Sequence, residues 1–85
     1  HDFSLIETIL LNENGELYLL DHHLERLERS AFYFGFAFDK KRIVTALNQA
    51  RASLFSKKGQ VAIRLLLQRD GEARCSSRAI EDVMT

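Results

Sequence analysis

The sequence predicts an α+β domain with two layers, in which an antiparallel sheet of about four strands is covered by two helices in the order ββααββ. Side chains alternate with a period of two residues at 3–11 and at 61–67, as in strands with one buried face. Apolar residues recur at helical spacing between residues 24 and 54. Turn residues follow both alternating segments, at Asn14-Gly15 and Asp70-Gly71.

The first hairpin is expected over residues 3–20. Its first strand places Glu7 on the same face as Phe3, Leu5, Ile9 and Leu11. Residues 12–15 provide the turn, because Asn and Gly tolerate the positive φ angles of tight hairpins. Residues 16–20 are expected to return as the second strand.

Two helices are expected next. The first begins at Asp21 as its N-cap and ends at Gly35. Its apolar positions are Leu24, Leu27, Ala31 and Phe34. The second begins at Asp39 and ends at Gly59, after two lysines that suit a helix C-terminus, Lys57 and Lys58. Its apolar positions are Ile43, Ala46, Leu47, Ala50 and Leu54.

Residues 32–38, between the helices, hold five of the eight aromatic side chains. We expect these side chains to fill the core where the helices meet the sheet, and a platform for an aromatic ligand is the alternative. A second hairpin follows, with a strand at 61–67, a two-residue type I′ turn at Asp70-Gly71 and a return strand from Glu72 to Ser77. Residues 78–85 show no clear period.

Composition narrows the class of protein. The chain has 85 residues, no formal net charge and 46% hydrophobic residues, which is typical of one small soluble globular domain. No apolar run is long enough to span a membrane and no signal-peptide pattern opens the chain, so a cytoplasmic protein is expected. Residues 31–69 carry eight Lys and Arg against one Asp, but no nucleic-acid recognition motif accompanies this charge.

Few residues indicate chemistry. His22 and His23 are adjacent, so on a helix they point about 100° apart and do not form an i,i+4 metal-binding pair. Cys75 has no histidine nearby, which favours a buried thiol over a nucleophile. The glycines form no phosphate-binding loop. We therefore expect neither a metal site nor a catalytic residue within the chain.

Two arginines remain as candidates. Arg26 lies outside the apolar stripe of the first helix and projects away from the core, as a solvated surface arginine does. Arg64 lies on the face of its strand opposite to the buried residues. Because an unpaired buried charge is too costly, Arg64 requires a carboxylate, a phosphate or open solvent. It forms an ion pair, for example with Glu7, or it faces a cleft and binds an anionic ligand.

Several strings in the sequence occur together in one enzyme class. They are Phe3-Ser4-Leu5-Ile6-Glu7-Thr8, Asn14-Gly15, His23-Leu24-Glu25-Arg26-Leu27 with Ser30-Ala31, and Val61-Ala62-Ile63-Arg64-Leu65. In this order they resemble the fold-type IV pyridoxal-phosphate enzymes, or class IV aminotransferase family, over residues 3–71. With the segment 33–39, Y-F-G-F-x-F-D, the chain is most similar to the 4-amino-4-deoxychorismate lyase domain fused to aminodeoxychorismate (para-aminobenzoate) synthase component I.

The resemblance implies that residues 1–85 are the small N-terminal domain of such an enzyme. Arg26 matches the family arginine that binds the phosphate of pyridoxal 5′-phosphate. Arg64 matches the strand arginine that helps to bind a substrate carboxylate in the aminotransferase branch. Glu7 matches an acidic position with a mainly structural role, and His23 matches a histidine that orients or packs. The family's Schiff-base lysine belongs to the larger domain and matches none of Lys40, Lys41, Lys57 and Lys58.

The chain alone is therefore expected to be inactive and to bind the cofactor weakly. The implied reaction of the parent protein is elimination of pyruvate from aminodeoxychorismate to give 4-aminobenzoate, for folate biosynthesis. The alternatives are the small domain of a branched-chain or D-amino-acid aminotransferase and a non-catalytic interaction or dimerisation domain. The expected partner is the large domain of the same protein. A homodimer is also compatible, because a domain separated from its partner exposes apolar surface.

Overall fold

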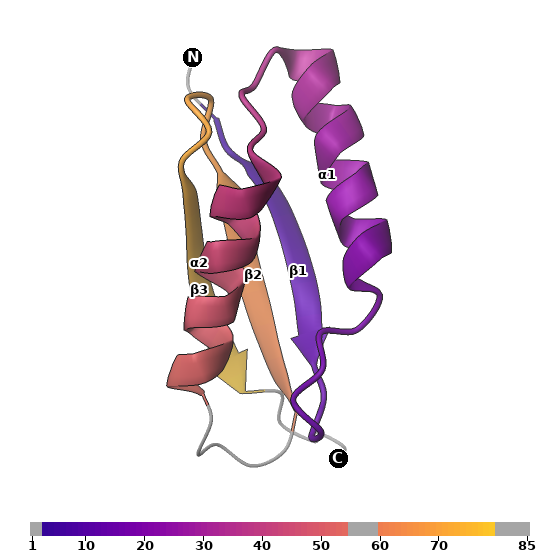
Figure 1. Cartoon of the computed structure of the whole chain (residues 1–85), viewed down its shortest axis with the longest axis vertical. Coiled ribbons are helices and arrows are strands. Elements are labelled where there is room, and N and C mark those ends of the chain that lie inside the picture. The colour runs from indigo at the N-terminus through magenta and orange to yellow at the C-terminus, as the bar shows by residue number, and fades with distance from the viewer. Residues whose placement is uncertain (1–2, 55–59, 80–85) are drawn as a thin grey trace.

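A computed structural model describes residues 3–54 and 60–79, which form three strands and two helices (Figure 1). The elements are β1 (Leu5–Leu11), α1 (Leu20–Phe34), α2 (Lys40–Ser53), β2 (Val61–Leu67) and β3 (Ala73–Ala79). The sheet is antiparallel in the order β1-β2-β3, and both helices lie on one of its faces (Figure 1). The predicted α+β class with two layers is confirmed.

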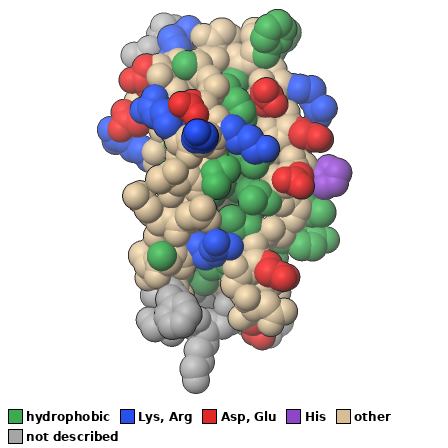
Figure 2. Space-filling model, in the orientation of Figure 1, with side chains coloured by type: hydrophobic (Ala, Val, Ile, Leu, Met, Phe, Trp, Pro, Cys, Tyr) green, Lys and Arg blue, Asp and Glu red, His purple; other side chains and the backbone are tan. Residues whose placement is uncertain are grey.

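The core lies between the sheet and the helices. Along β1 and β2 every second side chain points toward the helices and is buried, as the alternation predicted. Helix α1 packs on β1, and α2 packs on β2 and β3. Seen from the helix side, hydrophobic side chains gather between the two helices and charged side chains lie around them (Figure 2). The largest fully buried side chains are Ile9, Leu27, Ile43, Leu47, Ile63, Leu65 and Leu67.

The segment 16–20 differs from its prediction as a strand. It pairs with β1 only through a single bridge between Leu11 and Leu17, and α1 already begins at Leu20. The N-cap of α1 is Leu19, in a left-handed conformation with φ 53° and without a side-chain hydrogen bond. Asp21, predicted as the N-cap, lies inside the first turn. There its carboxylate still favours the positive end of the helix dipole, but it does not initiate the helix.

The turns at 12–16 and 68–72 each depend on one glycine with positive φ. The Gly71 amide donates to the Gln68 carbonyl (2.9 Å), and the Gln68 amide donates to the Glu72 carbonyl (2.8 Å). Only Gly71, with φ 94°, is left-handed in this turn, so it is a three-residue loop rather than the predicted type I′ turn, which needs two such residues. The turn at 12–16 has the same pattern, with Gly15 at φ 83°.

The second helix begins as predicted. The Asp39 side chain accepts hydrogen bonds from the amides of Lys41 (3.0 Å) and Arg42 (3.4 Å). The first helix also ends as predicted, at Gly35 with φ 77°. Helix α2 ends at Ser53, whereas the stop predicted at Gly59 lies outside the described residues.

The aromatic segment is only partly in the core. Phe36 is buried and Phe38 half-buried, but Phe32 and Tyr33 are 89% and 80% exposed. The prediction of a continuous core plug is therefore wrong for Phe32 and Tyr33. It is also wrong for Phe34, which was predicted on the apolar stripe of the first helix and is 47% exposed. Buried positions of α1 end at Ala31, and the next two residues turn away from the sheet because successive helical residues are about 100° apart.

Replacing Gly71 by alanine should destabilise the domain more than replacing Gly15. Each alanine would have to adopt a left-handed conformation, which costs about 1–2 kcal/mol. At Gly71 the new Cβ would also lie 3.2 Å from the Ala37 Cβ, whereas no atom lies within 4 Å at Gly15. Urea unfolding of Gly71→Ala and Gly15→Ala would measure both losses, and equal losses would show that the Ala37 contact is irrelevant.

Asp39→Ala should lower the free energy of unfolding by about 1 kcal/mol, because the N-cap hydrogen bonds of α2 are lost. Asp21→Ala is the matched control on α1, and we expect it to cost only about 0.3–0.5 kcal/mol through the helix dipole. Thermal unfolding followed by circular dichroism measures both. A loss at Asp21 as large as that at Asp39 would contradict the assignment of the caps.

Candidate functional site

One ionisable side chain is buried among the described residues, that of Glu7. It points from β1 toward the helices, in line with Leu5 and Ile9. The exposed fraction of its side chain is 7%, so the carboxylate requires partners to remain charged. Two residues of α1 provide them.

Arg26 and His23 both bind the Glu7 carboxylate. The Arg26 Nε donates to Oε2 (2.9 Å) and its Nη2 donates to Oε1 (2.8 Å), which makes a bidentate ion pair. The His23 Nδ1 lies 2.7 Å from the same Oε1 and donates to it, because an ionised carboxylate only accepts. When the imidazole is neutral, this contact fixes the tautomer with hydrogen on Nδ1.

The spacing of α1 explains the arrangement. His23 and Arg26 are three residues apart and therefore lie on one side of the helix. Their chain neighbours Leu24 and Leu27 are buried and hold α1 against the sheet. Arg26 is thus not the independent surface arginine that spacing alone predicted.

The ion pair favours the charged forms of Glu7 and Arg26. Burial would raise the pKa of Glu7, but the hydrogen bonds and charges of Arg26 and His23 outweigh burial and lower this pKa below its ordinary value. The hydrogen bond and charge of Glu7 raise the pKa of Arg26. The carboxylate is therefore ionised at neutral pH and holds the guanidinium in one orientation.

Arg26 retains hydrogen-bonding capacity. A guanidinium has five N–H donors, and Glu7 accepts from Nε and Nη2 only. The Arg26 side chain is 63% exposed, so its remaining donors are open to solvent. A guanidinium fixed on one edge and open on the other can bind an oxyanion such as a phosphate. The geometry therefore fits the phosphate of the implied cofactor.

The predicted ion pair between Arg64 and Glu7 is wrong. Arg64 of β2 pairs with Thr8 of β1. Both side chains point to the face of the sheet away from the helices, which we call the open face. Glu7 points to the other face. Arg64 instead lines a hollow of about 360 Å³ on the open face. This position matches the alternative in which Arg64 faces a cleft.

Arg78 lines the same hollow and was not identified from the sequence. The return strand was predicted to end at Ser77, whereas β3 continues to Ala79 and keeps Arg78 in register with Ala62. The alternation of Arg74, Ser76 and Arg78 would have been the signal.

The remaining candidates that the structure describes form no second centre. His22 is exposed, and no three His, Cys, Asp or Glu side chains gather as metal ligands within residues 3–54 and 60–79. Cys75 is half-buried on β3, and burial raises the pKa of its thiol. Lys40 and Lys41 lie exposed at the start of α2, on the other helix from Arg26, and Lys57 and Lys58 lie outside the described residues.

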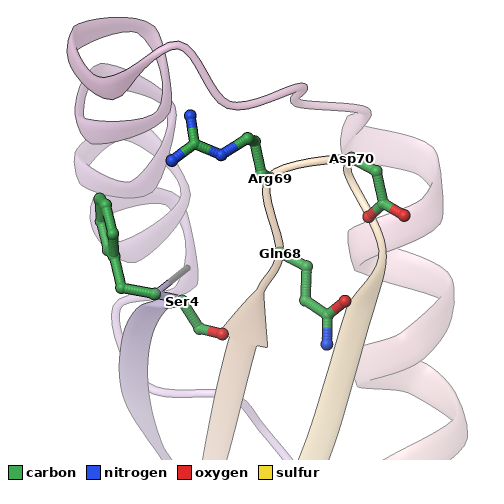
Figure 3. A pocket seen from close by; sticks show the side chains of 5 residues that line it. Ser4, Gln68, Arg69 and Asp70 are labelled. Atoms are coloured by element: carbon green, nitrogen blue, oxygen red, sulfur yellow. The ribbon is translucent and has the colours of Figure 1, made fainter. Parts of the chain in front are cut away.

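A further pocket of about 440 Å³ lies at the β2–β3 turn. Figure 3 shows the side chains of Arg69 and Asp70 extending from this turn in opposite directions. The Arg69 guanidinium lies over the rings of Phe36 (5.3 Å) and Phe3 (6.0 Å), so it links the turn to the aromatic cluster. This role is structural.

None of the helices in the described segments is long and apolar enough to cross a membrane.

Two comparisons with known proteins gave matches. The family model for amino-transferase class IV matches residues 4–84. A crystal structure from Mesorhizobium loti, described as that of an amino-acid aminotransferase, superposes with a TM-score of 0.84 at 36% sequence identity. The match covers 98% of this chain and 39% of that protein. No curated protein matches the chain closely enough to be compared. The family match over nearly the whole length establishes that the chain belongs to the class IV aminotransferase family.

Proposed function

We propose that this chain is the small domain of a pyridoxal-phosphate-dependent enzyme, in which Arg26 binds the cofactor phosphate and Arg64 contacts a substrate carboxylate. The observation that carries the proposal is the bidentate Glu7–Arg26 pair, which fixes a guanidinium whose other donors face solvent. Membership of the class IV aminotransferase family supports the choice of cofactor.

The chain's own residues bind and orient. Glu7 holds the Arg26 guanidinium, and His23 occupies a further lone pair of the Glu7 carboxylate, so that this carboxylate does not rotate. Arg64 presents a second guanidinium on the open face. When bound, the cofactor supplies an electron sink for negative charge on a substrate carbon. The lysine that this chemistry requires is proposed to lie beyond the 85 residues, so the chain alone is proposed to be inactive.

The proposed reaction of the whole protein is elimination of pyruvate from aminodeoxychorismate, which gives 4-aminobenzoate. It is supported by the strings Phe3 to Thr8 and Tyr33 to Asp39. Amino-acid transamination is the second candidate, favoured by the similarity to the Mesorhizobium loti protein. A dimerisation or interaction domain without a ligand is the third. The third candidate differs from the other two because it assigns Arg26 no ligand.

Arg26→Gln should weaken phosphate binding about tenfold or more, because charge-assisted hydrogen bonds contribute about 1.5–3 kcal/mol. NMR titration with inorganic phosphate, pyridoxal 5′-phosphate and pyridoxal would follow the backbone amide signals around position 26 in the unmodified chain and in the variant. In the unmodified chain it would also follow the Arg26 Nε–H signal. Both phosphates should shift this signal, with affinities in the millimolar range or weaker, and pyridoxal should not.

Arg29→Gln is the matched control, since Arg29 is an exposed arginine one turn further along α1 and has no contact with Glu7 among the described residues. It should leave phosphate binding unchanged. Equal effects of the two variants, or an equal response to pyridoxal, would contradict a phosphate site at Arg26 and favour the interaction domain.

Glu7→Gln should make the stability of the domain less dependent on pH. The folded-state pKa of Glu7 is lowered, so the ionised cluster stabilises the fold above the ordinary glutamate pKa of about 4.3, and this contribution is lost as the pH falls below it. Urea unfolding should show a loss of about 1–3 kcal/mol at neutral pH and a shallower decline in acid.

Glu28→Gln, at an exposed position of α1, is the control for a general effect of removing one negative charge. Its unfolding free energy should follow that of the unmodified chain at every pH. If Glu7→Gln also did so, the Glu7 cluster would have no part in stability.

A further inference from the structure

The open face of the sheet places two arginines next to each other. Arg64 lies between Thr8 of β1 and Ser76 of β3. Arg78 pairs with Ala62 and is therefore the diagonal neighbour of Arg64, at about 7–8 Å in this geometry. Both arginines are exposed and both line the hollow of about 360 Å³.

The lining of the hollow suits a small organic anion. Ile6 and Ala62 give it an apolar part, and Thr8 and Ser76 add hydroxyl groups beside the two guanidinium groups. The hydroxyls can donate or accept a hydrogen bond, and each guanidinium matches a carboxylate with two parallel donors. An apolar body that carries two carboxylates would use every part of this lining.

The charges of the face are not balanced within the described residues. No acidic side chain occupies an outward position of β1, β2 or the described part of β3. Neither Arg64 nor Arg78 forms an ion pair among residues 3–54 and 60–79. Two neighbouring positive charges repel each other, and a ligand with two negative charges removes this repulsion.

Arg74 differs from Arg64 and Arg78 in having a carboxylate partner. It is also on β3, faces the same way and is the other diagonal neighbour of Arg64. Its Nε donates to Glu72 Oε2 (3.3 Å), and it does not line the hollow. The face therefore contains one arginine with a carboxylate of its own and two that converge on the hollow.

We infer that Arg78 is a specificity-determining residue and that the molecule bound by Arg64 carries a second carboxylate, which Arg78 binds. The site then selects small dicarboxylates over monocarboxylates of similar size. That this molecule is the substrate rests on the proposed function.

The test is NMR titration of the full chain with glutarate, butyrate and inorganic phosphate at constant ionic strength. Glutarate should bind at least tenfold more tightly than butyrate and should shift the side-chain signals of Arg64 and Arg78 but not that of Arg74. Arg78→Gln should weaken glutarate binding about tenfold and leave butyrate binding within twofold. Arg74→Gln, the matched control, should leave both within twofold.

Equal affinity for glutarate and butyrate would overturn the inference, as would equal losses in the Arg78 and Arg74 variants, since both results indicate general charge attraction. Phosphate binding as tight as that of glutarate at Arg64 and Arg78 would overturn the assignment to dicarboxylates. The signals of the unmodified chain give an answer even if Arg78→Gln fails to fold, because a shift of Arg64 alone also overturns it.

Failure of this inference is distinguishable from failure of the proposed function. Arg26→Gln tests the phosphate site on the helix side of β1 and should not change glutarate binding. Loss of selectivity for glutarate with phosphate binding at Arg26 intact would remove only the role of Arg78. Loss of phosphate binding at Arg26 with selectivity for glutarate intact would remove only the phosphate site.

Discussion

The arrangement of the candidate site depends on a carboxylate placed in an apolar layer. Glu7 occupies a position that alternation reserves for a core side chain, and its charge can remain there only with partners. Arg26 and His23 provide them from α1, the helix that packs on β1. The same contacts therefore attach the helix to the sheet and orient the guanidinium. Any change that shifts α1 along β1 would also move the donors that Arg26 presents to solvent.

Strand β1 separates Arg26 from Arg64. Its consecutive residues Glu7 and Thr8 point to opposite faces, and each has an arginine beside it: Arg26 on the helix side and Arg64 on the open face. β1 is an edge strand of the described sheet, and the two arginines lie on its opposite faces. The proposed cofactor phosphate and the proposed substrate carboxylates can then lie on either side of one strand without competing for the same arginine.

Much of the fold follows from local sequence, and the errors have identifiable causes. The periods of β1, β2 and both helices predicted their buried faces, except at Phe34, which is exposed at the end of α1, because burial of one face is what creates the period. Asp21 was misassigned as an N-cap because the chain turns earlier, at Leu19, through a left-handed residue that no propensity favours. The pair of Glu7 with Arg64 was excluded by the strand period itself, since the two residues are in opposite phase. Which cation Glu7 contacts, however, depends on how α1 packs, and local sequence does not determine that packing.

Arg78 was missed for a more general reason. Prediction of strands from sequence relies on contrast between a buried apolar face and a solvated polar face, and along β3 this contrast is weak because Cys75 is only half-buried and its neighbours are small or charged. A strand face that presents arginines and hydroxyls to a hollow has no hydrophobic residues, so hydrophobic periodicity does not indicate the strand. Because the polar groups that bind an anion stay accessible, only the alternation of Arg74, Ser76 and Arg78 indicates the strand here. The register with β2 determines which residues of β3 face outward, because the buried residues of β2 fix the face to which each opposite residue of β3 points. Arg78 therefore points to the open face.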